Sequence, residues 1–260
     1  MPTVKEIESY LFSIAPKELA MSWDNVGLLI GQPSHPVKSV LVALDITDEV
    51  VDEAIEIGAD LIISHHPVMN CKWLPVQSVR DDTYQGHIVI KMIQHNISAI
   101  CMHTNLDIAD GGVNDMLAKV LHLTQIEPLG EDGCGRVGYL KDEVPLDSFI
   151  KTVCDALNSN GLRFVSAGKP VYYVAVGGGA CWDYHKDVLH KNCDTFVTSD
   201  LGYHDFLDAK AMGLNVIDAG HFPTEDVICP QIITLLKNQY PILTISKSLS
   251  HKEVFQYYTK

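Results

Sequence analysis

Histidine and carboxylate residues follow directly after several short apolar runs of this chain. They stand in segments 64–67 (Ser-His-His-Pro), 103–107 (His-Thr-Asn-Leu-Asp), 198–200 (Thr-Ser-Asp) and 220–225 (Gly-His-Phe-Pro-Thr-Glu). Two of these segments carry an acid four residues after a histidine. Neutral imidazole and carboxylate suit Zn²⁺, Fe²⁺ or Mn²⁺, whereas an all-oxygen set would favour Mg²⁺ or Ca²⁺. The segments therefore predict a site for a divalent metal.

Each of these residues also has an ordinary structural interpretation. His65 and His66 could be turn residues, and Asp107 could cap a loop. Glu225 could stabilise the first turn of a helix that Thr224 caps. Adjacent residues of an extended strand point to opposite sides, so His65 and His66 can serve one centre only where the strand has ended, or if two ions are present. The occurrence of all these residues at equivalent ends of strands favours the metal site.

Apolar runs alternate with amphipathic stretches along most of the chain. The first stretch, with Val4, Ile7, Leu11 and Ile14, has helical spacing and precedes an apolar run at 27–30. Further strands are expected at 39–45, 60–64, 97–102, 171–176, 194–198, 214–218 and 242–245, and helices at 48–58, 84–96, 145–158, 182–191, 203–212 and 225–239. Strands that alternate with helices in this way predict an α/β fold.

The two halves of the chain repeat the same order of elements and of polar residues. In each half a strand, a helix and a second strand lead to a histidine, His103 or His221, with an acid four residues on. Glycines and acids at 127–135 interrupt the periodicity, which favours a join between two lobes, residues 1–128 and 129–260. Ligands of open α/β sheets bind beyond the carboxyl ends of the strands, where the polar segments lie.

The composition disfavours several classes of function. The 260 residues include 33 acidic and 19 basic ones, a formal net charge of −14 at pH 7, so a basic nucleic-acid surface is not expected. A bound dication would still allow a phosphate ligand. No apolar run approaches the roughly 20 residues of a spanning helix. The N-terminus lacks a signal-peptide pattern, so we expect a cytoplasmic protein without a membrane partner. The seven cysteines form no CxxC pair and are expected to be reduced.

Four segments also resemble the motifs of a known family. Residues 22–28 (Ser-Trp-Asp-Asn-Val-Gly-Leu), 63–67, 102–107 and 220–225 are similar to motifs of the GTP cyclohydrolase I type 2 homologues, also called the NGG-interacting-factor-3-like family. The resemblance runs from about residue 4 to about residue 255. It implies a duplicated α/β unit with two intertwined three-layer α/β/α lobes and mixed sheets, in which a C-terminal segment of about 240–260 could exchange into the first lobe. It also implies a dinuclear metal centre and a toroidal homohexamer.

The resemblance implies a ligand set that draws on both halves of the chain. The implied ligands are His65, His66, Asp107, His221 and Glu225, which would hold two divalent ions per chain, Zn, Fe or Mn. Five ligands leave open positions for water on two ions, and Glu225 could bridge them. The ions should tie the two lobes together, but each lobe has its own apolar core. We therefore expect the metal-free chain to remain folded, unlike a zinc finger.

Other residues carry less specific signals. His103 could support a ligand or carry protons, or it could be an ordinary core histidine. His204 matches a family position near the cavity and could contact substrate, or it could be a surface residue at a helix start. Gly177–Gly179 could bind an anion but lacks the residues that complete a phosphate loop, which favours a tight turn. Residues 23–25 (Trp-Asp-Asn) favour structural roles, packing for the indole and turn capping for the Asp or Asn.

The sequence thus favours a metal-dependent hydrolase that acts on a small nucleotide-like substrate. A metal-bound hydroxide would attack an electrophilic carbon or phosphorus, with His103 or His204 as proton carrier. In the reaction that the family name implies, the imidazole ring of guanine opens and formate is lost. Two alternatives are a dinuclear phosphoesterase that acts on nucleotides and a non-catalytic metal-binding scaffold or metal chaperone.

Overall fold

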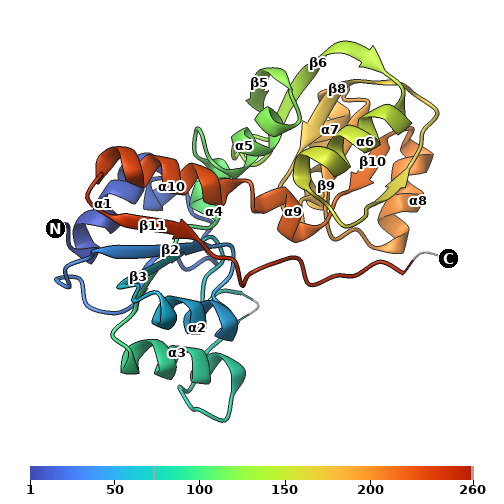
Figure 1. The fold of residues 1–260 in the computed structure, drawn as a ribbon. Coiled ribbons are helices and arrows are strands. Elements are labelled where there is room, and N and C mark those ends of the chain that lie inside the picture. Colours follow the sequence, from blue (N-terminus) through green and yellow to red (C-terminus); the bar gives the residue numbers. More distant parts are fainter. Residues whose placement is uncertain (73, 259–260) are drawn as a thin grey trace. The chain divides into compact units, whose positions relative to one another are not determined.

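The computed structural model describes residues 1–72 and 74–258, so the last two residues of the expected second lobe lie outside the described residues. The chain divides into two compact units. The first consists of Met1–Asp110 and Ile228–Lys252, and the second of Gly111–Val227 and the residues from Glu253 onward. Each unit is built on one mixed β-sheet with helices, which confirms the expected α/β fold (Figure 1).

The first unit has a five-stranded sheet in the order β1-β4-β3-β2-β11. Its strands are β1 (Gly27–Ile30), β2 (Ser39–Ala43), β3 (Leu61–Ser64), β4 (Ser98–Cys101) and β11 (Thr244–Lys247). Its helices are α1 (Val4–Ile14), η1 (Lys17–Leu19), α2 (Asp48–Glu56), α3 (Tyr84–Gln94), α4 (Thr104–Ile108) and α10 (Ile228–Gln239). Strand β1 is antiparallel to β4, and the other neighbours are parallel. Helices α2 and α3 cover one face of this sheet and α1 and α10 the other (Figure 1).

Local sequence explains the elements that lead to the candidate ligands. Thr3 and Glu6 form a capping box at the start of α1, where Val4, Ile7 and Leu11 are buried at the expected helical spacing. All four residues of β3 are buried, as in a parallel strand that is covered on both faces. Because β3 ends at Ser64, the two adjacent histidines follow the strand instead of lying within it.

The second unit has a six-stranded sheet in the order β5-β6-β8-β9-β10-β7. Its strands are β5 (Thr124–Pro128), β6 (Arg136–Val144), β7 (Arg163–Val165), β8 (Val171–Val176), β9 (Thr195–Thr198) and β10 (Asn215–Asp218). Its helices are α5 (Val113–Val120), α6 (Leu146–Leu157), η2 (Trp182–Tyr184), α7 (His185–His190), α8 (Tyr203–Met212) and α9 (His221–Glu225). Strands β8, β9 and β10 are parallel neighbours. The antiparallel pairs are β5 with β6, β6 with β8, and β7 with β10. Phe149 and Val153 of α6 belong to the same core cluster as Val174, Val197 and Ile217 of these parallel strands.

The division of the chain differs from the expected join at 127–135. Strand β5 pairs with β6, so residues from Gly111 onward belong with the second sheet. Helix α10 and strand β11 return to the first unit because β11 pairs with β2. The C-terminal segment that belongs to the first unit therefore begins at Ile228, earlier than the expected position of about residue 240. The residues from Glu253 onward belong to the second unit.

The helix expected at 225–239 needs correction. Helix α9 begins at His221 and has Glu225 as its last residue, and a separate helix, α10, begins at Ile228. Thr224 is therefore not an N-cap, and its hydroxyl donates to the carbonyl of Gly220 at 2.8 Å. Pro223 lies in the first turn of α9, where the N–H that proline lacks is not needed by a helix.

The cysteines and the apolar character of the helices can also be compared with the sequence. All seven cysteines are free thiols, and six of them are buried, as expected for reduced cysteines that pack as small apolar side chains. Within residues 1–72 and 74–258, no helix combines the length and the apolar character that crossing a bilayer would require.

Candidate metal centre

His65 and His66 directly follow strand β3, where main-chain hydrogen bonds turn the chain. The N–H groups of both residues donate to the carbonyl of Leu44, at 3.1 and 2.9 Å. The centroids of the two imidazole rings are 5.0 Å apart. Adjacent residues of an extended strand would point to opposite faces. The turn after β3 instead brings both rings to one region, as a shared metal site requires.

His103 joins these two histidines in a cluster. It precedes helix α4, and its ring centroid is 5.0 Å from that of His65 and 5.5 Å from that of His66. One ligand nitrogen from each of the three rings lies within 4.8 Å of the others. Three imidazoles at this spacing repel one another when protonated and suit a divalent cation when neutral.

An oxygen acceptor lies beside the Nδ1 atom of each ring in the cluster. The pairs are His65 Nδ1 with the carbonyl of Met102 at 2.8 Å, His66 Nδ1 with Asp45 Oδ1 at 2.7 Å, and His103 Nδ1 with Asp24 Oδ1 at 2.9 Å. Carbonyls and carboxylates only accept hydrogen bonds, so each Nδ1 must carry a proton. The lone pair of each neutral ring is therefore on Nε2, which is the arrangement found in metal-binding histidines.

Asp24 orients His103 and also caps helix α4. Its second oxygen accepts hydrogen bonds from the N–H and the hydroxyl of Thr104. Burial alone would raise the pKa of Asp24, but the hydrogen bond and charge of His103, together with the Thr104 hydrogen bonds, lower this pKa to about 2. Asp24 is therefore ionised at neutral pH. The expected capping of a turn by residues 23–25 is thus replaced by the capping of a helix 80 positions away, and the contact with His103 is an additional role.

Asp107 places a carboxylate beside the histidine cluster. It lies in helix α4 and is buried, and its N–H donates to the carbonyl of His103 at 3.0 Å. One helical turn thus explains why Asp107 follows His103 by four residues in the sequence. Oδ1 of Asp107 is 3.5 Å from Nε2 of His65. The first unit therefore pairs an imidazole Nε2 with a carboxylate, the combination of ligand types that the sequence predicted.

The second unit presents the same pairing on helix α9. His221 Nε2 lies 3.0 Å from Glu225 Oε2, and His221 Nδ1 lies 2.6 Å from Asp200 Oδ2. Burial lowers the pKa of His221, but the charges of Glu225 and Asp200 and the hydrogen bonds to both carboxylates raise it to about 11. Without metal the ring is therefore an imidazolium. A divalent cation at Nε2 would take the place of that proton.

Glycine at 177–179 allows the chain to pass close to this pair. A Cβ atom on Gly179, whose φ is +63°, would lie 2.1 Å from Glu225 Oε1 and 3.1 Å from His221 Nε2. The N–H groups of Gly178 and Gly179 donate to Asn114 Oδ1 and Thr224 Oγ1, at 2.8 and 3.0 Å. Because side chains of the protein occupy these two donors, the glycine run is a closely packed turn and not an anion-binding loop.

The donor chemistry of both units fits a divalent cation of the zinc, iron or manganese type. Imidazole nitrogens with fixed Nδ1 protons stand next to carboxylate oxygens in each unit. Imidazole with carboxylate is the ligand combination that these cations share. The sequence did not reveal the supporting roles of Asp45 and Asp200, although both follow the ends of apolar runs, which is the signal that marked the candidate ligands.

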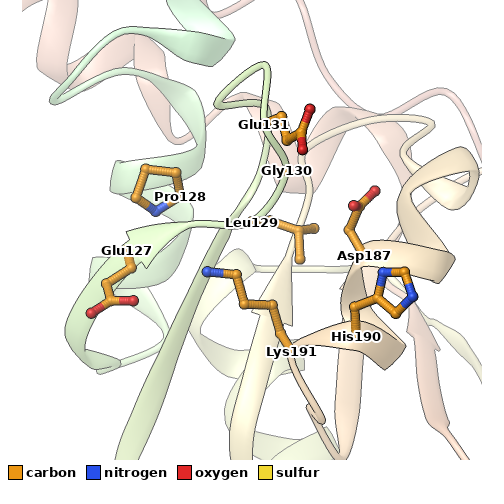
Figure 2. A pocket seen from close by; sticks show the side chains of 8 residues that line it. All are labelled: Glu127, Pro128, Leu129, Gly130, Glu131, Asp187, His190 and Lys191. Carbon is orange, nitrogen blue, oxygen red and sulfur yellow. The ribbon is translucent and has the colours of Figure 1, made fainter.

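Two other features lie apart from these groups. His204 is exposed in the first turn of α8, with its ring centroid 5.4 Å from that of Tyr203, so its contact with substrate remains a prediction. A pocket of about 500 Å³ in the second unit is lined by residues 127–131 together with Asp187, His190 and Lys191 (Figure 2). None of the lining residues is a candidate ligand.

Comparison with known proteins leads to one family. The model of Duf34/NIF3 (NGG1p interacting factor 3) matches residues 2–252. A Clostridium perfringens protein named GTP cyclohydrolase 1 type 2 homolog is 34% identical over 229 residues, 85% of this chain and 86% of that protein. The crystal structure of a hypothetical protein from Staphylococcus aureus is 33% identical, with a TM-score of 0.91 and coverage of 98% of this chain and 99% of that chain. A Bacillus cereus protein described as related to NIF3 has a TM-score of 0.92 at 28% identity over 99% of each chain. The chain therefore belongs to the Duf34/NIF3 family.

Proposed function

We propose that this protein is a metal-dependent hydrolase with two divalent ions per chain. The ligands would be His65, His66 and Asp107 from the first unit and His221 and Glu225 from the second. The observation that carries the proposal is that an oxygen acceptor faces Nδ1 of each of these histidines. A proton held on Nδ1 leaves the lone pair of Nε2 available to a metal ion in each of these rings.

The chain's own residues would bind the substrate and move protons. Five ligands do not saturate two ions, so positions remain for water and substrate, as catalytic sites require. Bound divalent ions would supply Lewis acidity and a water of lowered pKa. The Nδ1–H group of His103 donates a hydrogen bond to Asp24. Nε2 of His103 could therefore take up and return a proton, while the carboxylate stabilises the imidazolium. His204 is a second candidate for proton transfer.

We further propose that the substrate is small and nucleotide-like. The name carried by relatives from Clostridium perfringens and Streptomyces coelicolor, GTP cyclohydrolase 1 type 2 homolog, supports this substrate class. The corresponding reaction is hydrolytic opening of the imidazole ring of guanine with loss of formate. The net charge of −14 disfavours long polyanions, but it is compatible with a phosphate that a dication holds.

A product analysis would test the reaction. Metal-loaded protein is incubated with a panel of nucleotides, and mass spectrometry distinguishes release of formate from release of phosphate. Formate release that is lost in His65→Ala and kept in His95→Ala, at an exposed histidine, would support the cyclohydrolase reaction. Phosphate release alone would replace it with a phosphoesterase. A metal-loaded protein without turnover would be a non-catalytic metal scaffold.

Chelation would separate a catalytic centre from a structural one. Each unit has its own buried apolar cluster, so the stripped chain should keep its circular dichroism spectrum. It should lose turnover together with only part of its thermal stability, because the metal stabilises the folded state by mass action. Global unfolding on chelation would show that the centre is structural and would contradict the hydrolase proposal.

We also propose a homohexamer, on the family resemblance alone. Light scattering of micromolar protein should give six times the chain mass of 28.7 kDa. A stable monomer at that concentration would contradict this assembly.

A further inference from the structure

The C-terminal part of the first unit ends beside the candidate ligands. Strand β11 pairs in parallel with β2, and the N–H of Ser248 continues the ladder to the carbonyl of Val42 at 2.8 Å. Asp45 follows β2, and His251 follows β11. Because the two strands are parallel neighbours, both residues lie beyond the same edge of the sheet.

Glu53 of helix α2 holds the backbone of this segment. It accepts hydrogen bonds from the hydroxyl of Ser248 at 2.6 Å and from the N–H groups of Leu249 and Ser250, each at 3.0 Å. The N–H of His251 in turn donates to the Ser248 hydroxyl oxygen at 3.2 Å. The position of His251 is therefore set by a network within the first unit and not by an isolated contact.

Asp45 connects His251 to the candidate ligand His66. Its Oδ1 is 2.7 Å from His66 Nδ1, and its Oδ2 is 2.9 Å from His251 Nε2. Both rings must donate, because a carboxylate only accepts. The side chains of His66 and His251 are only 15% and 10% exposed, whereas that of Asp45 is 41% exposed. With one ring on each oxygen, the carboxylate is held in a single orientation.

We propose that His251 is a positioning residue of the metal centre, acting through Asp45 to hold the Nδ1 proton and the ring orientation of His66. This inference rests on the proposed metal-binding function. His251 stands 206 positions after Asp45 in the chain. The segment that follows β11 would then help to set the metal affinity of a site whose candidate ligand, His66, follows a different strand, β3.

Cobalt binding tests the inference without any activity assay. The metal-free full-length chain is titrated with Co²⁺ and followed by visible absorption, with a chelator in competition. His251→Phe keeps a ring but removes the donor, and Co²⁺ binding should weaken about tenfold, the low end for residues that support ligands. His251→Gln keeps an N–H donor and should restore most of the affinity. His95→Ala, at an exposed histidine, should leave binding unchanged.

A double-mutant cycle tests whether His251 acts through Asp45. Adding His251→Phe to Asp45→Asn should weaken Co²⁺ binding no further than Asp45→Asn alone. Additive losses, or equal affinities of wild type and His251→Phe, would overturn the inference while leaving the metal centre intact. A wild-type chain that binds no Co²⁺ would overturn the proposed centre and this inference with it. Urea unfolding of each metal-free variant verifies folding, and His251→Ala replaces His251→Phe if the larger ring is not accommodated.

Discussion

The two units share one strand plan but place different residues at its strand ends. The order β1-β4-β3-β2 in the first unit corresponds to β7-β10-β9-β8 in the second. In both, three parallel strands carry an antiparallel strand at one side. This correspondence supports the duplication that the sequence predicted. The plan determines where polar side chains can act, and the residue type at each place determines what they do.

The strand ends after β3 and β9 show the difference most clearly. The first unit has His65 and His66 there, and the second has Ser199 and Asp200. His65 and His66 are candidate ligands, whereas Asp200 holds Nδ1 of His221. The first unit thus has candidate ligands at this strand end, and the second has there a carboxylate that contacts a candidate ligand from a neighbouring strand end.

The strand next to β2 and its counterpart next to β8 differ in direction. Strand β11 is parallel to β2 and brings His251 to the edge where the candidate ligands lie. Strand β6 is antiparallel to β8, so its carboxyl end lies at the opposite edge. The support that His251 provides through Asp45 therefore depends on a strand direction that only the first unit has.

The largest effect should come from the glycine turn of the second unit. Gly179→Ala would place a Cβ atom 2.1 Å from Glu225 Oε1 and so displace this carboxylate, and we therefore expect loss of metal and a fall in the free energy of unfolding beyond that of backbone strain alone. Gly168→Ala is the matched control, because its φ of +73° is similar but no atom lies within 4 Å. The control should cost only about 1–2 kcal/mol of backbone strain. Urea unfolding and metal analysis of both variants would show equal losses if the close approach to Glu225 does not matter.

A ligand of the second unit should matter more for metal content than a supporting histidine of the first. Wild type should carry close to two divalent ions per chain, and Glu225→Ala should lose more of them than His103→Ala, because a bridging ligand contacts both ions. Elemental analysis of the purified proteins measures this difference. Equal loss in both variants would place His103 among the ligands themselves.

Removing the support of a ligand should have a smaller effect than removing the ligand. Asp200→Asn keeps the shape of the side chain, and Asn tolerates the left-handed backbone at φ 58°. Loss of its charge beside His221 Nδ1 should weaken metal binding about tenfold. Asp183→Asn, at an exposed position of the same unit, is the control for charge removal. Competition with a chelator gives both affinities, and identical values would contradict the supporting role of Asp200.

The smallest change at a fixed pH is the release of one proton when metal binds to the second unit. The pKa of His221 is raised to about 11, so the metal-free ring is protonated at pH 7 and a cation must displace one proton. Affinity at this histidine should therefore rise with pH up to about 11, by as much as tenfold per pH unit. The raised pKa stabilises the metal-free fold fully below the ordinary histidine value, and this stabilisation disappears as pH rises through 11.

A weakly buffered titration would measure this release. Zn²⁺ is added to metal-free protein at pH 7 with a pH indicator, and the same titration of His221→Gln provides the comparison. The wild type should release about one proton more per chain than the variant. The same release from both proteins would mean that His221 is already neutral before metal binds.

The sequence by itself predicted the parallel strands and the types of the candidate ligands. Strand β8 and helix α8 occupy the predicted ranges 171–176 and 203–212, because a buried strand and a helix each have a local pattern. Strands β5, β6 and β7 were not anticipated. Strand β7 has only three residues, Arg163–Val165, none of them fully buried, so no apolar run marks it.

Only the tertiary structure decided which oxygen faces each histidine Nδ1. Asp24 and His103 are 79 positions apart, and Asp45 and His251 are 206 positions apart. No local spacing predicts such pairs, because they meet only after strands distant in the sequence have become neighbours in a sheet. The strand and helix ends that carry the candidate ligands are marked by local sequence patterns. The proton position that leaves Nε2 available depends on long-range packing, and for this reason the sequence predicted the candidate ligands but not most of the residues that orient them.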